Sequence, residues 1–261
     1  MGSDKRRVKG ALLDLDGTVW DDEIAPYDGA AETVARLREA GLPVRFVTNT
    51  TRLSRKALAE MLSERGLAAE ADDVFTATLA GVIRLREWGV TRIAVLLPDA
   101  ALSEFADFDV VEDDPEALIV GDLGAGWTFE VLNRAFRWLR AGAEFLALHR
   151  NPYWKTEGEL VLDAGAFVAA LEYATDSEAT LVGKPSPVLF QAAARSLELE
   201  PGDLAMVGDS LRTDIPGAQA AGCLGVLVRT GKFDEVELAN SDVEPDTVID
   251  SIAKLPQALD L

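Results

Sequence analysis

The chain has little cysteine and histidine, and it contains no long apolar run. Its 261 residues include one cysteine, Cys223, and one histidine, His149. A single cysteine excludes an internal disulfide bond, which fits a reducing cytoplasm. No apolar run approaches the roughly 20 residues of a membrane-spanning helix. The opening MGSDKRRVKG is basic, but no apolar signal-peptide core follows it. We therefore expect a cytoplasmic protein without a membrane span.

Positive charge is also scarce. The chain carries 45 acidic and 25 basic side chains, a formal net charge of −20, and arginine strongly outnumbers lysine. This balance argues against binding nucleic acid through a basic surface and against binding anionic membranes. A dispersed acidic surface with few lysines suits a high-salt cytoplasm, where ions screen the self-repulsion. The same composition also fits an ordinary acidic protein.

Strand-like and helix-like segments alternate along the chain. Residues 43–49, 91–98, 203–210 and 224–231 have the apolar character of buried strands, and amphipathic helices are predicted between such runs. Ser54 is the expected N-cap of a helix over 54–66. Residues 128–142 predict a helix with one apolar stripe, formed by Phe129, Leu132, Phe136 and Leu139. This alternation favours an α/β fold with a mostly parallel sheet, split by a middle domain.

Two aspartates come where the first apolar run ends. In ALLDLDGTVW, Asp14 and Asp16 lie two positions apart on a strand, so their side chains start on the same face. Two close anions repel each other, and burial strengthens the repulsion. A divalent cation with oxygen ligands would offset that cost. The same residues also fit a strand that ends in a solvated Asp-Gly turn.

Polar motifs follow several predicted strands. Carboxyl ends of strands are where open α/β sheets bind ligands, so these motifs form one candidate site. Each has a structural explanation when taken alone, such as a capped turn, a solvated charge or a helix N-cap. The segments are Asp14-Leu-Asp16-Gly-Thr18, Thr48-Asn49-Thr50-Thr51, Gly183-Lys184-Pro185 and Gly208-Asp209-Ser210, the last with Asp214 five residues after Asp209.

DLDGT, VTNTT, GKPSP and GDSLRTD, in this order, resemble the haloacid dehalogenase (HAD) superfamily of phosphotransferases. The segments GAQAAGCLGVLVRTGKF and AFVAALEYATDSEATLVGKPSP are similar to its class II, subtype A capped phosphatases. That branch includes p-nitrophenyl-phosphatase-like enzymes and phospholysine phosphohistidine inorganic pyrophosphate phosphatase. The resemblance implies a Rossmann-like parallel-sheet HAD core with an inserted α/β cap domain. We expect core segments at 1–71 and 182–261 and a cap at 72–181.

The resemblance also implies catalytic roles. Asp14 is the implied nucleophile, which forms an aspartyl-phosphate. Asp16 is the implied general acid and then general base, and it gives its backbone carbonyl to Mg²⁺. That role needs a carboxyl group that can be protonated near neutral pH, which a neighbouring carboxylate and apolar surroundings favour. Lys184 supplies a positive charge to the phosphoryl group and to Asp14.

Phosphate and metal contacts are implied in the same way. Thr48 and the backbone of Asn49 are expected to bind phosphoryl oxygens. Asp209 is an expected Mg²⁺ ligand, and Asp214 either binds the ion through water or orients Lys184. The sequence departs from many relatives at Ser210, where they carry a second acidic residue. Asp214 remains at a permitted spacing, so we expect activity to be retained with a weaker affinity for the metal.

These residues predict a Mg²⁺-dependent phosphatase acting on a small phosphorylated metabolite or a phosphorylated side chain. Tyr153 and Lys155 are the expected substrate contacts of the cap, although Tyr153 and Trp154 also fit a role in packing the cap core. The mechanism does not require His149. A phosphotransferase or mutase on the same core, and a non-enzymatic protein that binds a phospho-ligand or Mg²⁺, are the alternatives. We expect a small phosphorylated substrate as partner, no nucleic acid or membrane, and a homodimer through the cap.

Overall fold

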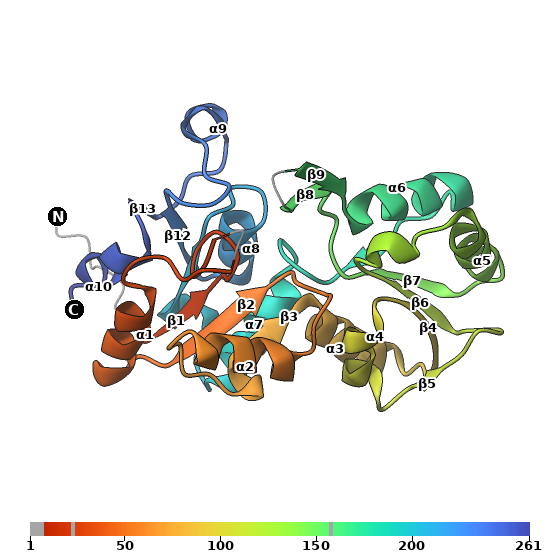
Figure 1. The fold of residues 1–261 in the computed structure, drawn as a ribbon, viewed down its shortest axis with the longest axis horizontal. Helices are drawn as coiled ribbons and strands as arrows, with labels where there is room; N and C mark the ends of the chain where they lie inside the picture. Colours follow the sequence, from red (N-terminus) through yellow and green to blue (C-terminus); the bar gives the residue numbers. More distant parts are fainter. Residues whose placement is uncertain (1–7, 22–23, 157–158) are drawn as a thin grey trace. The chain divides into compact units, whose positions relative to one another are not determined.

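The structure is a computed structural model, and it describes residues 8–21, 24–156 and 159–261. The chain divides into two compact units. The first, here called the core unit, comprises Met1–Thr48, Leu58–Phe75 and Lys184–Leu261. The second, here called the inserted unit, comprises Asn49–Ala57 and Thr76–Gly183. Figure 1 shows the helices and strands of both units.

A six-stranded sheet forms the centre of the core unit, in the order β13-β12-β11-β1-β2-β3. The pairs from β13 to β2 are parallel. Strands β1 and β11 are buried over their whole length, which explains their continuous apolar sequence, since both faces of such a sheet are covered. The strands are β1 (Gly10–Leu13), β2 (Val44–Thr48), β3 (Val74–Thr76), β11 (Leu204–Gly208), β12 (Leu224–Val228) and β13 (Thr247–Ile249).

The helices of the core unit pack against this sheet. Helix α8 lies on β11 and β12 and contacts α7, while α7 and α1 contact β2. These helices are α1 (Ala30–Glu39), α7 (Pro187–Ser196), α8 (Asp214–Ala221), α9 (Glu235–Asn240) and α10 (Leu255–Ala258). Helix α2 (Arg55–Glu64) begins in the inserted unit and ends in the core unit. The Ser54 hydroxyl accepts a hydrogen bond from the Ala57 amide at 3.2 Å, so the predicted N-cap is confirmed.

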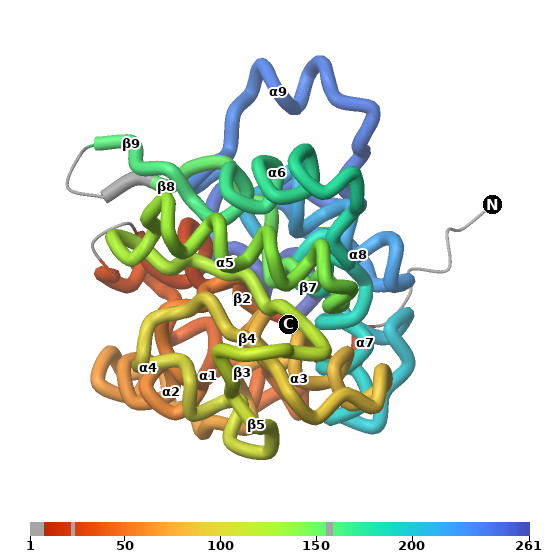
Figure 2. Tube along the Cα trace, turned by 90° about the vertical axis from the view of Figure 1, so that its right-hand side faces the viewer, coloured from red at the N-terminus to blue at the C-terminus, as the bar shows by residue number. Residues whose placement is uncertain are grey.

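The inserted unit has its own parallel sheet, in the order β10-β7-β6-β4-β5. Its strands are β4 (Arg92–Leu96), β5 (Asp109–Val110), β6 (Ala117–Val120), β7 (Glu144–Ala147) and β10 (Thr180–Leu181). An antiparallel hairpin, β8 (Tyr153–Thr156) and β9 (Glu159–Leu162), lies next to helix α6 (Figure 2). The helices are α3 (Ala77–Trp88), α4 (Asp99–Leu102), α5 (Phe129–Arg140) and α6 (Ala164–Thr175).

Helix α5 carries the predicted apolar residues, but its first residue is exposed. Leu132, Phe136 and Leu139 pack against the apolar core of the inserted unit, whereas Phe129 is 81% exposed. Phe129 therefore lies on the predicted stripe but is not covered by the core. The helix contributes Ala135 and Trp138 as its buried residues instead.

The predicted α/β class with parallel sheets is confirmed in both units. Within the described ranges, no helix combines the length and the apolarity needed to cross a membrane.

Candidate active site

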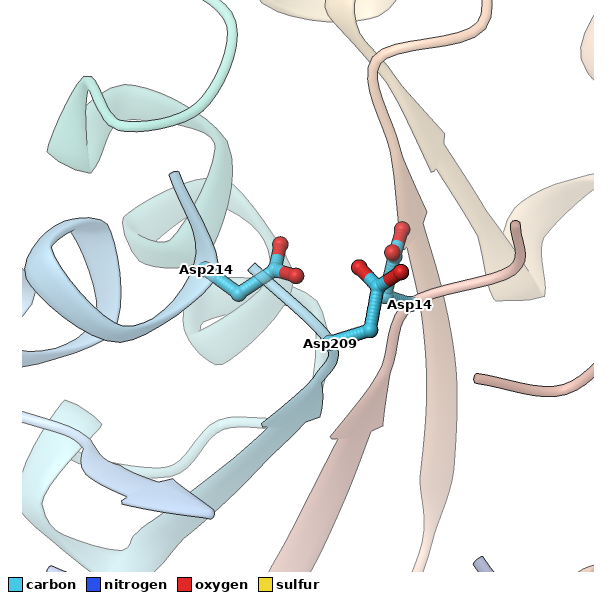
Figure 3. Close-up of side chains that lie close together, drawn as sticks. All are labelled: Asp14, Asp209 and Asp214. Carbon is cyan, nitrogen blue, oxygen red and sulfur yellow. The ribbon is translucent and has the colours of Figure 1, made fainter. Parts of the chain in front are cut away.

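Two buried aspartates lie side by side at one edge of the core sheet. Asp14 directly follows β1 and Asp209 directly follows β11, and these strands are parallel neighbours. The Asp14 amide donates to the Val207 carbonyl at 2.9 Å, which continues the ladder past the end of β1. Asp14 is 6% exposed and Asp209 is 1% exposed. In Figure 3 their carboxylates and that of Asp214, at the start of α8, point toward one another.

Lys184 joins this group of carboxylates. Its Nζ lies 2.5 Å from Asp14 Oδ1 and 2.7 Å from Asp214 Oδ1, and it also donates to the Val47 carbonyl at 3.2 Å. Asp214 is fully buried, and its other oxygen accepts the Ser210 amide at 3.0 Å. Sequence segments from four parts of the chain therefore meet at one buried point.

Asp209 is oriented by backbone contacts. Its Oδ2 accepts the Lys232 amide at 2.7 Å. Gly17 and Gly231, with φ of 83° and 60°, lie against the same oxygen, and a Cβ built on either would come within 2.0 Å of it. Only glycine fits both the conformation and the space at these positions.

Electrostatics in this cluster follow from burial. Burial raises the pKa of Asp14 well above its ordinary value, and Asp214 adds to the rise while Lys184 opposes it. Burial, together with Asp214, raises the pKa of Asp209 to about 7. Burial by itself would lower the pKa of Lys184, but the carboxylates of Asp14 and Asp214 outweigh it and raise that pKa. The ammonium group is therefore charged throughout the physiological range.

The cluster has the composition of a site for a divalent cation. Ligand oxygens of Asp14, Asp209 and Asp214 lie within 4.8 Å of one another. Asp209 Oδ1 is buried and accepts no hydrogen bond from the described residues. The carboxylates of Asp14, Asp209 and Asp214 outnumber the nearby ammonium groups of Lys184 and Lys232, and a bound cation would offset the remaining negative charge. All-oxygen ligands suit Mg²⁺, so these residues fit that ion.

Asp16 lies apart from the three clustered carboxylates. Its side chain is exposed, and Oδ1 accepts a hydrogen bond from Trp20 Nε1 at 2.8 Å. Its charge still adds to the rise in the pKa of Asp14, so the two carboxylates are near each other. The strand ends at Leu13, and Gly17 turns the backbone, so the period of two no longer applies.

The two phosphate-contact candidates are consecutive in the chain and lie at the end of β2. Thr48 is the last residue of β2 and is 1% exposed, beside the Val47 carbonyl that Lys184 contacts. Asn49 is the first residue of the inserted unit and is half-buried.

The cap candidates lie in the β8–β9 hairpin. Tyr153 is 56% exposed, so the alternative that it packs the cap core is wrong. Trp154 is half-buried, with the Arg52 guanidinium 5.1 Å from its ring centre. The side chain of Lys155 lies outside the described residues. His149 is buried, with Nε2 3.8 Å from an oxygen of Asp163, the N-cap residue of α6.

Comparisons with known proteins agree with this geometry. The haloacid dehalogenase-like hydrolase family matches residues 11–111, and the HAD-hydrolase-like family matches residues 181–255. Haloacid dehalogenase-like hydrolase domain-containing protein 2 from Mus musculus is 39% identical over 98% of this chain and 96% of its own length. The chain belongs to the haloacid dehalogenase-like hydrolase family.

Other relatives of this HAD hydrolase are phosphatases. Phospholysine phosphohistidine inorganic pyrophosphate phosphatase from Rattus norvegicus is 35% identical over 97% of this chain and 94% of its own length. The 4-nitrophenylphosphatase structure from Thermotoga maritima superposes with a TM-score of 0.90 at 28% identity, covering 97% of this chain and 98% of that one. The predicted branch and the predicted enzyme class, a HAD-type phosphatase, are confirmed.

A second phosphatase structure contains the expected ion. Glycerol phosphate phosphatase from Mycobacterium tuberculosis, in complex with magnesium, has a TM-score of 0.87 and 30% identity, covering 95% of this chain and 76% of that one. A divalent metal is thus compatible with this HAD hydrolase, in line with its own cluster of acidic residues.

Several contacts of this HAD hydrolase were not predicted from its sequence. The hydrogen bond from Trp20 to Asp16 and the bond from the Lys232 amide to Asp209 are both absent from the predicted site. The contact of the Lys232 amide could have been predicted from the sequence, because TGK at 230–232 follows β12, which ends at the same edge of the sheet as β1 and β11. The Trp20 contact depends on how the turn closes, which the motif spacing alone does not give.

Proposed function

We propose that the protein is a Mg²⁺-dependent phosphatase that hydrolyses phosphomonoesters through an aspartyl-phosphate on Asp14. The observation that carries this proposal is the buried contact between Asp14 and Lys184, 2.5 Å apart, beside the carboxylates of Asp209 and Asp214. A nucleophilic carboxylate needs neighbouring positive charge to meet an anionic phosphate ester, and this arrangement supplies it.

The first half-reaction forms the aspartyl-phosphate. A carboxylate oxygen of Asp14 attacks phosphorus, and the bond from phosphorus to the ester oxygen breaks. The electron pair of that bond goes to the leaving oxygen, which takes a proton from Asp16. The leaving group departs as a neutral alcohol or phenol.

The second half-reaction releases inorganic phosphate. Asp16, now ionised, takes a proton from a water molecule as the water oxygen attacks phosphorus. The bond from phosphorus to Asp14 breaks, and its electron pair returns to the carboxylate. Asp16 is then protonated and ready for the next cycle, as the two roles of one acid–base group require.

The remaining residues bind and orient the phosphoryl group. The ammonium group of Lys184 balances the negative charge of Asp14 and of the phosphoryl oxygens. The Thr48 hydroxyl and the Asn49 backbone donate hydrogen bonds to those oxygens. Asp214 orients Lys184, a role supported by their contact of 2.7 Å. The position of Lys184 is fixed further by the Val47 carbonyl.

The groups that would hold Mg²⁺ are Asp14, Asp209, the backbone carbonyl of Asp16 and, through water, Asp214. When bound, the ion offsets the negative charge of the carboxylates and of the phosphoryl group. Asp209 Oδ1 is buried and accepts no hydrogen bond within the part of the chain that the structure describes, which supports its role as a ligand. Ser210, where many relatives carry an acid, accepts the amides of Arg212 and Thr213 at 3.2 Å and so orders the loop before α8.

The substrate is a small phosphorylated metabolite or a phosphorylated side chain. The relatives act on different phosphates according to their names, which include glycerol phosphate and phospholysine. The inserted unit serves as a cap domain that carries specificity, with Tyr153 and Lys155 as substrate contacts. The exposure of Tyr153 supports its part of this role.

Turnover of 4-nitrophenyl phosphate with and without Mg²⁺ tests the proposal. Asp14→Asn should abolish turnover, because an amide does not replace the nucleophilic carboxylate. Asp107→Asn, at an exposed aspartate of the inserted unit, is the matched control and should retain full activity. Asp14→Asn turnover within about tenfold of the wild type, or full activity in excess chelator, would contradict the proposal.

Two further points need separate tests: whether the phosphoryl group is transferred to water or to another acceptor, and the oligomeric state of the protein. A phosphatase releases one inorganic phosphate for each alcohol formed, whereas a phosphotransferase or mutase releases less. The cytoplasmic location and the homodimer through the cap stay predictions. Sedimentation of the purified protein decides the oligomeric state.

A further inference from the structure

A buried tryptophan holds the exposed Asp16 carboxylate. Trp20 is 2% exposed, and its Nε1 donates to Asp16 Oδ1 at 2.8 Å. Both residues belong to the core unit, in the turn that follows β1. An exposed aspartate otherwise samples several rotamers, so this hydrogen bond restricts where the carboxylate points.

The turn fixes the indole as well as the carboxylate. The Leu15 carbonyl accepts the amides of Thr18, Val19 and Trp20 at 3.2, 2.9 and 3.1 Å. The Gly17 amide donates in turn to the Trp20 carbonyl at 2.7 Å. The backbone of Trp20 therefore closes the turn that carries Asp16, while its side chain is buried.

We propose that Trp20 is the positioning residue for Asp16, holding it where it exchanges a proton with the leaving oxygen. This inference rests on the proposed function, because it assumes that Asp16 is the acid and base of the phosphatase reaction.

The chemistry of indole suits this role. Indole Nε1 is a hydrogen-bond donor only, so it neither accepts the proton of Asp16 nor competes with the substrate for it. The group is also neutral, and it orients the carboxylate without placing a full positive charge beside it. An arginine or lysine there would favour the ionised form of the carboxyl and oppose its action as an acid.

The consequence depends on the leaving group. A good leaving group such as 4-nitrophenolate departs with little protonation, whereas phenolate needs more help from the acid. Loss of a well-placed proton donor should therefore slow phenyl phosphate hydrolysis more than 4-nitrophenyl phosphate hydrolysis. The ratio of the two kcat values, measured on one preparation, is independent of the fraction of folded enzyme.

The experiment compares Trp20→Phe with Trp138→Phe. Trp138 is the matched control: it is a buried tryptophan of the inserted unit whose Nε1 donates to the Glu112 carbonyl at 3.1 Å. We expect the phenyl to 4-nitrophenyl ratio of kcat to fall about tenfold or more in Trp20→Phe, part of the range that general acid catalysis supplies. The ratio should stay at the wild-type value in Trp138→Phe.

A double-mutant cycle separates positioning from a general structural effect. In the Asp16→Asn background, Trp20→Phe should leave the ratio unchanged, because the acid on which Trp20 acts is gone. An unchanged ratio in Trp20→Phe alone, or an equal fall in both backgrounds, would overturn the inference. Failure of the proposed function has a different signature: a wild type without turnover, or an active Asp14→Asn variant.

A second measurement does not depend on the folding of Trp20→Phe. Hydrogen exchange of the five indole N–H groups is followed by NMR in the wild type and in Asp16→Ala. The Trp20 indole should exchange faster when its acceptor is removed, while the other four keep their rates. An unchanged Trp20 rate would show that the hydrogen bond does not form in solution.

Discussion

Asp209 receives its orientation from the segment that follows β12. The Lys232 amide holds Oδ2, and the Thr230 hydroxyl donates to the Gly17 carbonyl at 2.6 Å. Through these two contacts, the segment after β12 connects the turn that carries Asp16, the proposed acid, with Asp209, the proposed metal ligand. With Oδ2 held by backbone, Oδ1 is the oxygen left to face the other carboxylates.

Gly231→Ala should therefore weaken Mg²⁺ binding. The added Cβ would come within 2.0 Å of Asp209 Oδ2, so the ligand must move. We expect a loss of about 10- to 100-fold in Mg²⁺ affinity, as for other changes behind a metal ligand, measured by calorimetric titration. Gly89→Ala is the control, since Gly89 has φ of 70° and nothing within 4 Å of its Cβ position. Equal affinity in both variants would contradict the prediction.

The raised pKa of Asp209 predicts a pH dependence of stability without metal. In the folded protein this pKa is about 7, against an ordinary value of 3.8, so the folded state binds the proton more tightly than the unfolded state. The stability of the metal-free protein should therefore fall as the pH rises through this window. Thermal melts in chelator between pH 5 and pH 8 measure this fall, which Asp209→Asn should reduce. A melting temperature that rises with pH equally in both proteins would refute the assignment.

At the scale of the elements, long patterned segments were predictable and short ones were not. The continuous apolar runs of β1, β2 and β11 predict strands, because both faces of the sheet are buried. Ser54 predicts the start of a helix, because its hydroxyl caps a backbone amide. Strands β3, β5 and β13 have two or three residues each, too few for a period to appear. They exist because a neighbouring strand pairs with them.

Helix α5 shows the limit of periodicity. Phe129 is in phase with Phe136, yet only Phe136 packs against the core of the inserted unit. A period gives the direction of a side chain but not whether another element covers that end of the helix.

Substitutions in α5 should follow burial rather than pattern. Phe129→Ala should change the free energy of unfolding by less than about 0.5 kcal/mol, as at other exposed positions. Trp138→Ala should cost about 3–5 kcal/mol, because it removes a large buried side chain. Urea denaturation of the two variants measures both values. A larger loss for Phe129→Ala would show that this residue is covered in solution.

The same contrast holds for the site. Asp14 and Asp209 come together because the carboxyl ends of the parallel neighbours β1 and β11 share one edge of the sheet, which motif order and spacing make predictable. Lys184, shortly before α7, and Asp214, the first residue of α8, complete the cluster. The exposure of Asp16 and its bond to Trp20 depend on the course of a five-residue turn. No period describes such a turn, so its side-chain contacts required the structure.

For the whole molecule, charge predicts a response to salt. With 45 acidic and 25 basic side chains, the folded chain repels itself at low ionic strength. The Debye length, over which a charge is felt, shortens from about 30 Å at 0.01 M salt to about 3 Å at 1 M salt. The repulsion therefore weakens, and the melting temperature should rise over the first few hundred millimolar KCl. A surface adapted to high salt should continue to gain stability into the molar range. A melting temperature that is flat throughout would contradict the self-repulsion, and a plateau after the screening range would indicate an ordinary acidic protein.

The central claim is that Asp14 carries the phosphoryl group during turnover. Borohydride reduces an acyl phosphate to an alcohol, so enzyme quenched with borohydride during turnover should contain homoserine at position 14. Peptide mass spectrometry identifies the modified residue, with Asp14→Asn and enzyme without substrate as controls. We predict homoserine at position 14 only in wild-type enzyme that is turning over. Homoserine at another aspartate, or none at any position while turnover continues, would contradict the account.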